Sequence, residues 1–220
     1  MPFGIIDYYR MLKSRGYKFP LCYFFENHYF DIINKTDTHK RIDKSAYSDI
    51  PKNFEHGVLY MSSWTSVIRR TSKIILKLTE TKSTYFVDVG CGKGKVLCVW
   101  SQCLPDQQIY LMGIEYSKDL FNIAKNNLKI LAIDNCLLIN SDICDVDFGS
   151  NNEDVCYVFY LFNPFGSKVM QNFIQKIKLL DCFIIYNNPI HRHLFTQFEK
   201  VYEEKGWHPN LEFIIYRNKV

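Results

Sequence analysis

Three glycines at alternate positions form the segment best suited to bind a ligand. They are Gly90, Gly92 and Gly94 in VDVGCGKGKVL (87–97), which follows an apolar run and precedes a helical pattern. Without a Cβ, glycine lets the backbone turn sharply and come close to a ligand. A glycine loop between a strand and a helix is the context that nucleotide binding requires. The alternative is a tight turn that binds nothing.

The spacing of the glycines separates two kinds of cofactor. A dinucleotide-binding loop reads G-x-G-x-x-G, and the position of its last glycine holds Lys95 in this chain. The observed pattern is G-x-G-x-G, with Asp88 two residues before it. This fits S-adenosylmethionine (SAM), because the carboxylate can accept a hydrogen bond from the amino group of that cofactor. The loop therefore favours SAM over NAD.

Acidic residues end the next two predicted strands. Glu115 lies 25 residues after Gly90, a position from which a carboxylate can bind both hydroxyls of a ribose. Asp142 ends the third strand, where its carboxylate can accept from the amine of adenine while the N–H of Ile143 donates to the ring. Both features predict an adenosine-bearing ligand. A solvated acid at a strand end is the alternative for each.

Two Asn-Pro turns follow the fourth and fifth predicted strands, in FNPFG (162–166) and YNNP (186–189). Ligands of open α/β sheets lie at these strand ends. Asn163 can present an amide to the crevice, so we expect it to contact the cofactor and to orient the reacting group; an Asx-type turn is the alternative. His191 follows the second turn and is a candidate general base near neutral pH, with an ordinary surface histidine as the alternative.

The elements that must position these residues alternate between strand and helix from Thr84 onward. Predicted strands cover 84–90, 108–117, 136–142, 154–165 and 181–189, followed by an antiparallel pair at 200–207 and 211–218. Predicted helices cover 95–104, 118–131 and 167–180, with a short one at 191–200. Such alternation implies right-handed crossovers and a mainly parallel sheet.

The predicted fold is therefore α/β: a Rossmann-like three-layer sandwich whose mainly parallel seven-stranded sheet is closed by the C-terminal antiparallel pair. That pair departs from the six-stranded dinucleotide-binding order. Residues 1–80 are expected to form a helical N-terminal extension that covers the core, residues 81–220. We expect the aromatic segment KFPLCYFFENHYFDIINK (18–35) to supply part of a substrate pocket, with ordinary packing as the alternative.

Composition narrows the class of protein. Apolar residues make up 47% of the chain, which favours a globular protein over a disordered one. The net charge of +4 comes without a dense basic block, so nucleic acid is not indicated but stays open as a partner. The opening residues do not form a secretory signal, and no apolar stretch is long enough to cross a membrane. The eight cysteines include no C-x-x-C pair, which favours reduced thiols, no metal and a cytoplasmic location.

Taken together, four segments resemble the class I SAM-dependent methyltransferases, over about Thr84 to the C-terminus. They are VDVGCGKGKVL at the glycine loop, GIEYS (113–117) at the ribose strand, NSDICD (140–145) at the adenine strand and YLFNPF (160–165) at the fourth strand. The resemblance implies SAM as methyl donor and S-adenosylhomocysteine as product. It also implies cofactor contacts by Cys91 in the loop and by Tyr116, next to Glu115.

More narrowly, the chain is similar to a group of bacterial methyltransferases, many of unassigned substrate. Their pattern runs from D-T-x-x-R through a tyrosine-containing turn to G-C-G-K-G-R-V-L, then F-N-P-F and Y-x-N-P. The counterparts here are Asp37, Thr38 and Arg41, then GVLYMSSW (57–64), the glycine loop, FNPFG and YNNP. A weaker similarity reaches the non-SET histone lysine methyltransferases, which also place a tyrosine-bearing loop before the cofactor domain.

This narrower resemblance implies that Tyr60, Ser62 and Ser63 form a loop over the methionine end of SAM. The chain departs from the group at Met61 and Ser63, where proline and threonine are common. FNPFG also lacks the second proline of the N-P-P-[YF] motif found in many DNA and protein amide methyltransferases. That departure disfavours an exocyclic amine or a glutamine as the acceptor.

The sequence thus predicts a SAM-dependent methyltransferase with an unidentified methyl acceptor, most readily a small molecule or a glycan. A protein (lysine) or nucleic-acid methyltransferase is the first alternative, and a non-catalytic SAM-binding protein is the second. An NAD-dependent oxidoreductase is disfavoured by the glycine spacing and by the closing pair. A general base is needed only for a hydroxyl or a charged amine. The oligomeric state stays open.

Overall fold

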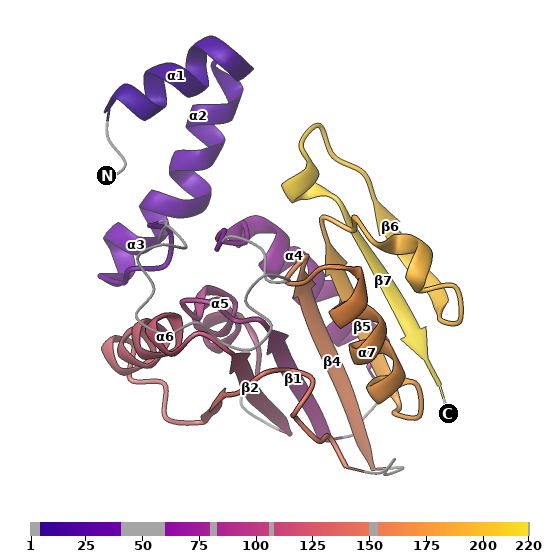
Figure 1. Ribbon diagram of the computed structural model, residues 1–220. Helices are drawn as coiled ribbons and strands as arrows, with labels where there is room; N and C mark the ends of the chain where they lie inside the picture. Colours follow the sequence, from indigo (N-terminus) through magenta and orange to yellow (C-terminus); the bar gives the residue numbers. More distant parts are fainter. Residues whose placement is uncertain (1–4, 41–59, 80–82, 106–107, 150–153, 220) are drawn as a thin grey trace.

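The computed structural model describes residues 5–40, 60–79, 83–105, 108–149 and 154–219. Its centre is a seven-stranded sheet in the order β3-β2-β1-β4-β5-β7-β6 (Figure 1). The strands are β1 (Ser83–Val89), β2 (Ile109–Glu115), β3 (Cys136–Asn140), β4 (Val155–Phe162), β5 (Cys182–Asn187), β6 (Glu199–Glu204) and β7 (Phe213–Asn218). Every one of these strands was predicted from the sequence, with bounds that differ by no more than about three residues.

The pairing of the strands confirms the predicted Rossmann-like fold. Strands β1 to β5 pair in parallel, while β7 runs antiparallel to both β5 and β6. Strands β1, β4 and β5 are largely buried, because both faces of the sheet centre are covered. The strand order reverses between β1 and β4. Ligands of open α/β sheets lie beyond the carboxyl ends of the strands at such a reversal.

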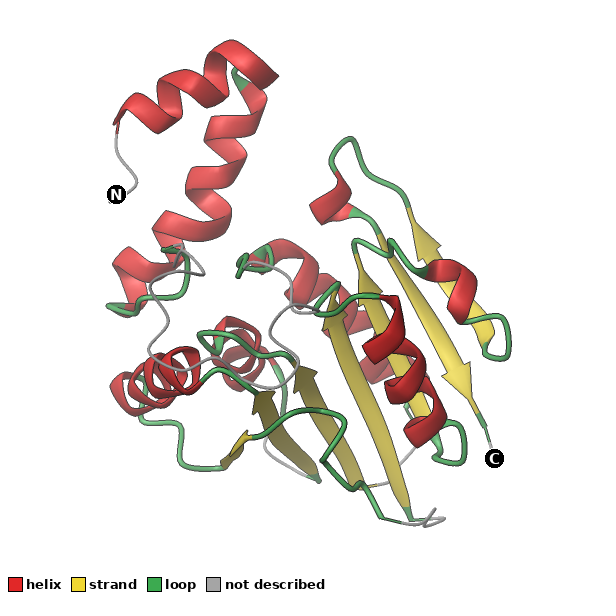
Figure 2. Cartoon of the chain, viewed as in Figure 1, coloured by secondary structure: helices red, strands yellow, loops and turns green. Residues whose placement is uncertain are grey.

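Helices cover both faces of the sheet (Figure 2). On one face lie α4 (Thr65–Leu78), α5 (Lys95–Cys103) and α6 (Lys118–Ile130), which share a hydrophobic cluster with Phe86 and Phe213 of the sheet. On the other face α7 (Ser167–Ile177) packs against Phe159 and Ile184 in a second cluster. The two clusters make the sandwich three layers thick.

Four short helices lie within residues 5–40: α1 (Ile5–Arg15), α2 (Lys18–Tyr23), the π-helix η1 (Phe24–His28) and α3 (Tyr29–Asn34). In Figure 1 they rise beside the carboxyl ends of the strands. Phe19 and Phe30 are buried in the same cluster as α4 and α5, so this helical extension packs against the core. Helix α4 itself belongs to the helical layer of the sandwich. The boundary near residue 80 stays a prediction.

The prediction of a helix over 191–200 is wrong. Only Arg192–Leu194 form a short 3-10 helix, η4, and β6 already begins at Glu199. The buried rings of Phe195 and Phe198 are three residues apart, which imitates helical spacing. They instead lie in a turn, in which the N–H of Phe198 donates to the carbonyl oxygen of Phe195.

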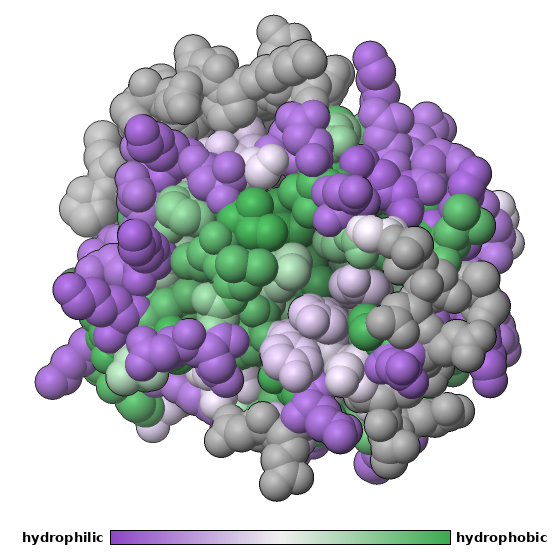
Figure 3. Space-filling model, turned by 90° about the horizontal axis from the view of Figure 1, so that it is seen from below, coloured by the Kyte–Doolittle hydropathy of each residue, from purple (hydrophilic) through white to green (hydrophobic). Residues whose placement is uncertain are grey.

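The end of the sheet opposite to the carboxyl ends of its parallel strands carries exposed hydrophobic side chains. Figure 3 shows a hydrophobic area at that end with hydrophilic residues around it. Tyr110 at the start of β2 and Leu137 at the start of β3 are among the exposed large hydrophobic residues. Among the described residues, no helix has the length and apolarity needed to cross a membrane.

Candidate active site

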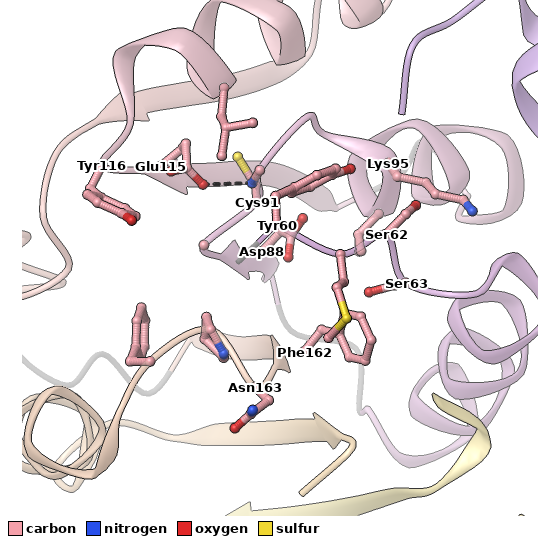
Figure 4. Close-up of a pocket in the computed structure, with 17 residues that line it drawn as sticks. Tyr60, Ser62, Ser63, Asp88, Cys91, Lys95, Glu115, Tyr116, Phe162 and Asn163 are labelled. Atoms are coloured by element: carbon pink, nitrogen blue, oxygen red, sulfur yellow. Dashed lines mark hydrogen bonds between the residues drawn. The ribbon is translucent and has the colours of Figure 1, made fainter. Parts of the chain in front are cut away.

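A cleft of about 70 Å³ opens at the carboxyl ends of β1, β2 and β4, next to the reversal of strand order. Figure 4 shows side chains converging on this central cleft from the glycine loop, the end of β2, the turn after β4 and the segment 60–63. The structure brings together most of the predicted site residues. Those that line the central cleft are Tyr60, Ser63, Asp88, Gly90, Cys91, Gly92, Glu115, Tyr116 and Asn163.

Two glycines of the loop are constrained for different reasons. Gly92 has a φ of +54°, and a Cβ there would lie 2.2 Å from Cε2 of the Tyr60 ring. Only glycine admits this contact, so the Tyr60 ring packs directly on the loop backbone. Gly94 has a φ of +77°, and a Cβ there would lie 3.2 Å from Cβ of Ala124 in α6. Gly94 does not line the central cleft, and its role toward a ligand stays a prediction.

Asp88, near the end of β1, is a buried acid that lines the central cleft. It is 4% exposed, and within the described part of the chain its carboxylate has no hydrogen-bond donor. Burial, together with the nearby charge of Glu115, raises the pKa of Asp88 well above its ordinary value. An unpaired buried carboxylate is costly, so a ligand that brings a donor or a positive charge would relieve that cost.

Glu115 ties the end of β2 to the glycine loop. Its Oε2 accepts a hydrogen bond from the N–H of Gly92 at 2.7 Å, and its Oε1 accepts one from the N–H of Ser117 at 2.9 Å. Burial raises the pKa of Glu115 to about 7, although these backbone donors act in the opposite direction. Each carboxylate oxygen keeps acceptor capacity for a further donor, such as a ribose hydroxyl.

Asn163 is held at the edge of the central cleft by Tyr186 of β5. Its φ of 46° is left-handed, a conformation that asparagine tolerates better than most residues. Oδ1 of Asn163 accepts a hydrogen bond from the hydroxyl of Tyr186 at 3.3 Å. The same hydroxyl accepts from the N–H of His191 at 3.1 Å. His191 thus helps to hold this network by its backbone, but it does not line the central cleft.

Comparison with known proteins identifies a family for part of the chain. Residues 86–180, from β1 to just past α7, match a family described as a methyltransferase domain. The match contains the glycine loop, Glu115 and Asn163, and the surrounding sheet has its closing strand antiparallel. Residues 86–180 therefore match a methyltransferase domain, in a fold of the class I, Rossmann-like type. The predicted enzyme class and cofactor are thereby confirmed. Among curated proteins, none matches the chain.

Solved structures share the fold of this methyltransferase domain. The ribosomal protein L11 methylase from Lactobacillus delbrueckii subsp. bulgaricus is 14% identical, with a TM-score of 0.50 over 71% of this chain and 79% of that one. The protein yhhF from Escherichia coli, named as a methyltransferase, is 14% identical, with a TM-score of 0.52 over 70% and 86%. A mutant of MtNAS in complex with S-adenosylmethionine is 11% identical, with a TM-score of 0.53 over 70% and 62%. Identities this low show the fold alone.

The methyltransferase fits SAM more clearly at the amino and ribose groups than at adenine. Asp88 and Glu115 offer buried acceptors in the central cleft, as that part of SAM requires. Asp142 and Ile143 do not line the cleft: Oδ1 of Asp142 accepts from the N–H of Cys144 at 2.8 Å, and Ile143 is buried in the cluster beneath α7. The adenine contacts therefore stay a prediction. Among the described residues, no cluster of His, Cys, Asp and Glu could hold a metal ion.

A second cleft, of about 480 Å³, adjoins the central cleft and shares Met61 and Ser62 with it. This outer cleft lies between the N-terminal helices on one side and the turns after β5 and before β7 on the other. Its residues are Asp7, Arg10, Met11, Ser14, Arg15, Phe19, Tyr23, Asn27, His39, Met61, Ser62, Trp64, Asn188, His208, Pro209 and Asn210. The lining includes aromatic residues of the segment 18–35 and Asn188 of YNNP.

Two lysines of the glycine loop anchor the N-terminal extension, a role that sequence reasoning missed. Nζ of Lys95 donates to Oδ1 of Asn27 at 3.0 Å and to the carbonyl oxygen of Glu26, and burial lowers the pKa of Lys95 to about 7. Lys93 forms an ion pair with Asp37 at 3.2 Å. Asp37 belongs to the D-T-x-x-R segment, so that motif offered a clue to the contact. Arg41 and residues 57–59 lie outside the described residues.

Proposed function

We propose that the methyltransferase transfers the methyl group of SAM to a small molecule or a glycan bound in the outer cleft. The observation that supports this most directly is the adjacency of the two clefts, which share Met61 and Ser62. A donor in one cleft and an acceptor in the other would meet at this shared edge. The outer cleft also has the aromatic walls and side-chain amides that suit a polar ring-bearing molecule.

Residue roles in this proposal follow from the contacts in the central cleft. Asp88 accepts from the amino group of the cofactor, and Glu115 accepts from its ribose hydroxyls. Asn163 orients the acceptor, because its side chain is held by Tyr186 at the edge of the cleft. The cofactor supplies an already activated methyl group, so the protein contributes chiefly alignment and exclusion of water. Alignment of this kind can supply roughly 7–11 kcal/mol of barrier reduction.

The cofactor part of the proposal is tested by isothermal titration. Wild-type protein is titrated with SAM, S-adenosylhomocysteine and NAD, and the titrations are repeated on Asp88→Ala. We expect the first two ligands to bind the wild type and to lose affinity in the variant. Binding of NAD in place of SAM would overturn the assignment.

The acceptor part is tested by transfer of labelled methyl groups to small-molecule, glycan, protein and RNA pools. Ser14→Trp places an indole on the wall of the outer cleft, and Lys13→Trp is its matched control on the same exposed helix, away from that wall. We expect transfer to small molecules or glycans that Ser14→Trp blocks and Lys13→Trp retains. Transfer confined to protein or RNA would identify the alternative class of acceptor, and transfer unaffected by Ser14→Trp would remove the outer cleft from the proposal.

A further inference from the structure

We propose that His39, held by Asp31, is the general base of the methyl transfer and that the acceptor atom is a hydroxyl oxygen. This inference rests on the proposed binding of the acceptor in the outer cleft. His39 lines that cleft, and its Nδ1 makes a short hydrogen bond with Oδ2 of Asp31. The two side chains are 10% and 5% exposed, so the pair is sheltered from solvent yet borders the cleft.

Asp31 accepts four hydrogen bonds in addition to the one from Nδ1 of His39. Its Oδ1 accepts from the hydroxyls of Thr36 and Thr38, both at 2.7 Å. Its Oδ2 accepts from the backbone N–H of Thr38 at 2.8 Å and from that of His39 at 3.0 Å. The chain from α3 therefore wraps around this one carboxylate. The result is a fixed acceptor directed at the His39 ring.

The protonation states that follow leave one nitrogen of His39 free to act as a base. Burial alone would raise the pKa of Asp31, but hydrogen bonds from His39, Thr38 and Thr36 outweigh it and hold that pKa below its ordinary value. An ionised carboxylate only accepts, so Nδ1 of His39 carries the proton and donates it. In the neutral imidazole Nε2 then holds the lone pair, the arrangement by which a carboxylate orients a catalytic histidine.

The groups packed around the pair preserve this arrangement. The ring of His28, from η1, lies 3.9 Å from the ring of His39, centroid to centroid. Burial, followed by the charge of His39, lowers the pKa of His28 to about 4, so His28 stays neutral at physiological pH. Lys95 and Asp31 are the other charged groups that act on His28. A short π-helix places His28, and such elements are frequent at functional sites.

Tyr60 connects the pair to the glycine loop. The Tyr60 ring packs on Gly92, and the Tyr60 hydroxyl donates a short hydrogen bond to the carbonyl oxygen of Thr38, next to His39. The base and the loop that holds the methyl donor thus share one support. His191, the base predicted from the sequence, lines neither cleft and has no comparable carboxylate partner among the described residues.

The proposed step moves the methyl group from sulfur to the acceptor oxygen and the acceptor proton to His39. The acceptor O–H bond breaks, and the proton passes to Nε2 of His39. The oxygen forms a bond to the methyl carbon with its freed electron pair. The bond from that carbon to sulfur breaks, its electron pair stays on sulfur, and S-adenosylhomocysteine results. Asp31 stabilises the imidazolium until the proton leaves to solvent.

The transfer test compares His39→Gln and Asp31→Asn with wild type, using methyl-labelled SAM and a defined mixture of phenols, nucleosides and monosaccharides. General-base catalysis is worth on the order of 10²- to 10⁴-fold, so we expect His39→Gln to lose at least about 100-fold in rate. SAM affinity, measured by titration, should stay within about twofold and shows that the variant is folded. His193→Gln, outside both clefts, is the matched control and should keep the wild-type rate. Added imidazole should partly restore the rate of methyl transfer in the His39→Ala variant.

A His39→Gln variant that keeps more than half of the wild-type rate of methyl transfer would overturn the role of His39 as the base. Transfer only to nitrogen or carbon would overturn the hydroxyl assignment. If the wild type methylates protein or RNA instead, the proposed small acceptor fails, and the same variants assayed on that pool still decide the role of His39. Nitrogen-15 NMR of histidine-labelled protein needs no acceptor. We expect His39 to be protonated at Nδ1 near pH 7.5 and to lose that preference in Asp31→Asn; protonation at Nε2 would refute the proposal.

Discussion

Glu115 should make the stability of the ligand-free methyltransferase fall as the pH rises. Its pKa lies at about 7 in the folded protein, against 4.5 for an unburied glutamate, because burial disfavours the charged form. The folded state therefore binds the Glu115 proton more tightly than the unfolded state does. The contribution of this proton to the free energy of unfolding is fully present below about pH 4.5 and is lost as the pH rises through about 7. The pKa difference corresponds to roughly 3 kcal/mol, at about 1.36 kcal/mol per pKa unit.

Glu115→Gln isolates this effect, because glutamine resembles the protonated acid and cannot ionise. Urea unfolding of both proteins from pH 4.5 to pH 8 should show similar free energies of unfolding at the acid end. At pH 8 the variant should be more stable by roughly 3 kcal/mol. Glu199→Gln, which changes an exposed glutamate, is the matched control. Parallel curves for wild type and Glu115→Gln would refute the buried-acid account.

Binding of the cofactor should favour the ionised form of Glu115, which burial disfavours. Ribose hydroxyls that donate to Glu115 favour its ionised form, so SAM binding near pH 6.5 should release protons. Titrations in buffers of different ionisation enthalpy measure that release directly. Glu115→Gln should release fewer protons than wild type and bind SAM more weakly. Equal release from both proteins would show that Glu115 does not contact the cofactor.

Three further substitutions probe the central cleft. Asp88→Asn keeps the shape of the side chain but loses a charge-assisted hydrogen bond to SAM of ~1.5–3 kcal/mol. Titration should therefore show SAM affinity reduced about 10- to 100-fold. Unchanged affinity would exclude Asp88 from the cofactor site. Gly92→Ala brings a Cβ to 2.2 Å from the Tyr60 ring, so thermal unfolding should show lower stability and methyl transfer should fall; a wild-type melting temperature would contradict that contact. Lys95→Met leaves Oδ1 of Asn27 without this donor, while the carbonyl oxygen of Glu26 keeps a hydrogen bond from the Thr65 hydroxyl. The variant should cost about 1–3 kcal/mol in urea unfolding, whereas an unchanged midpoint would mean that water replaces Nζ.

The fold could be predicted because the residues that define each strand and turn are neighbours in the sequence. Each parallel strand is a short apolar run that ends at glycine, proline or an acid, and the glycine loop marks the first strand-to-helix turn. The antiparallel closure followed from two runs separated by Gly206 and Pro209. The helix predicted over 191–200 failed for the same reason: local spacing of Phe195 and Phe198 resembled a helix, while packing under β7 placed them in a turn.

The candidate site was predictable only where residues lie at strand ends. Asp88, Glu115 and Asn163 follow from the register of parallel strands, whose carboxyl ends meet at one edge. His39 and Asp31 lie outside the sheet, and no periodic pattern relates them to it. Their position depends on a long-range contact, the packing of Tyr60 on Gly92, which only the folded structure reveals.

The N-terminal extension is more than a cover, because polar side chains fix it to the glycine loop. Lys95 and Lys93 reach from the glycine loop to Asn27 and Asp37, so the extension is fixed to the loop by buried polar contacts as well as by Phe19 and Phe30. A merely protective cover would need only the apolar contacts, because buried lysines are costly unless they are paired. Polar anchoring instead fixes orientation, since hydrogen bonds tolerate little displacement. An extension held in one orientation can place a base next to the methyl donor, and this is the role that the pair of Asp31 and His39 requires of it.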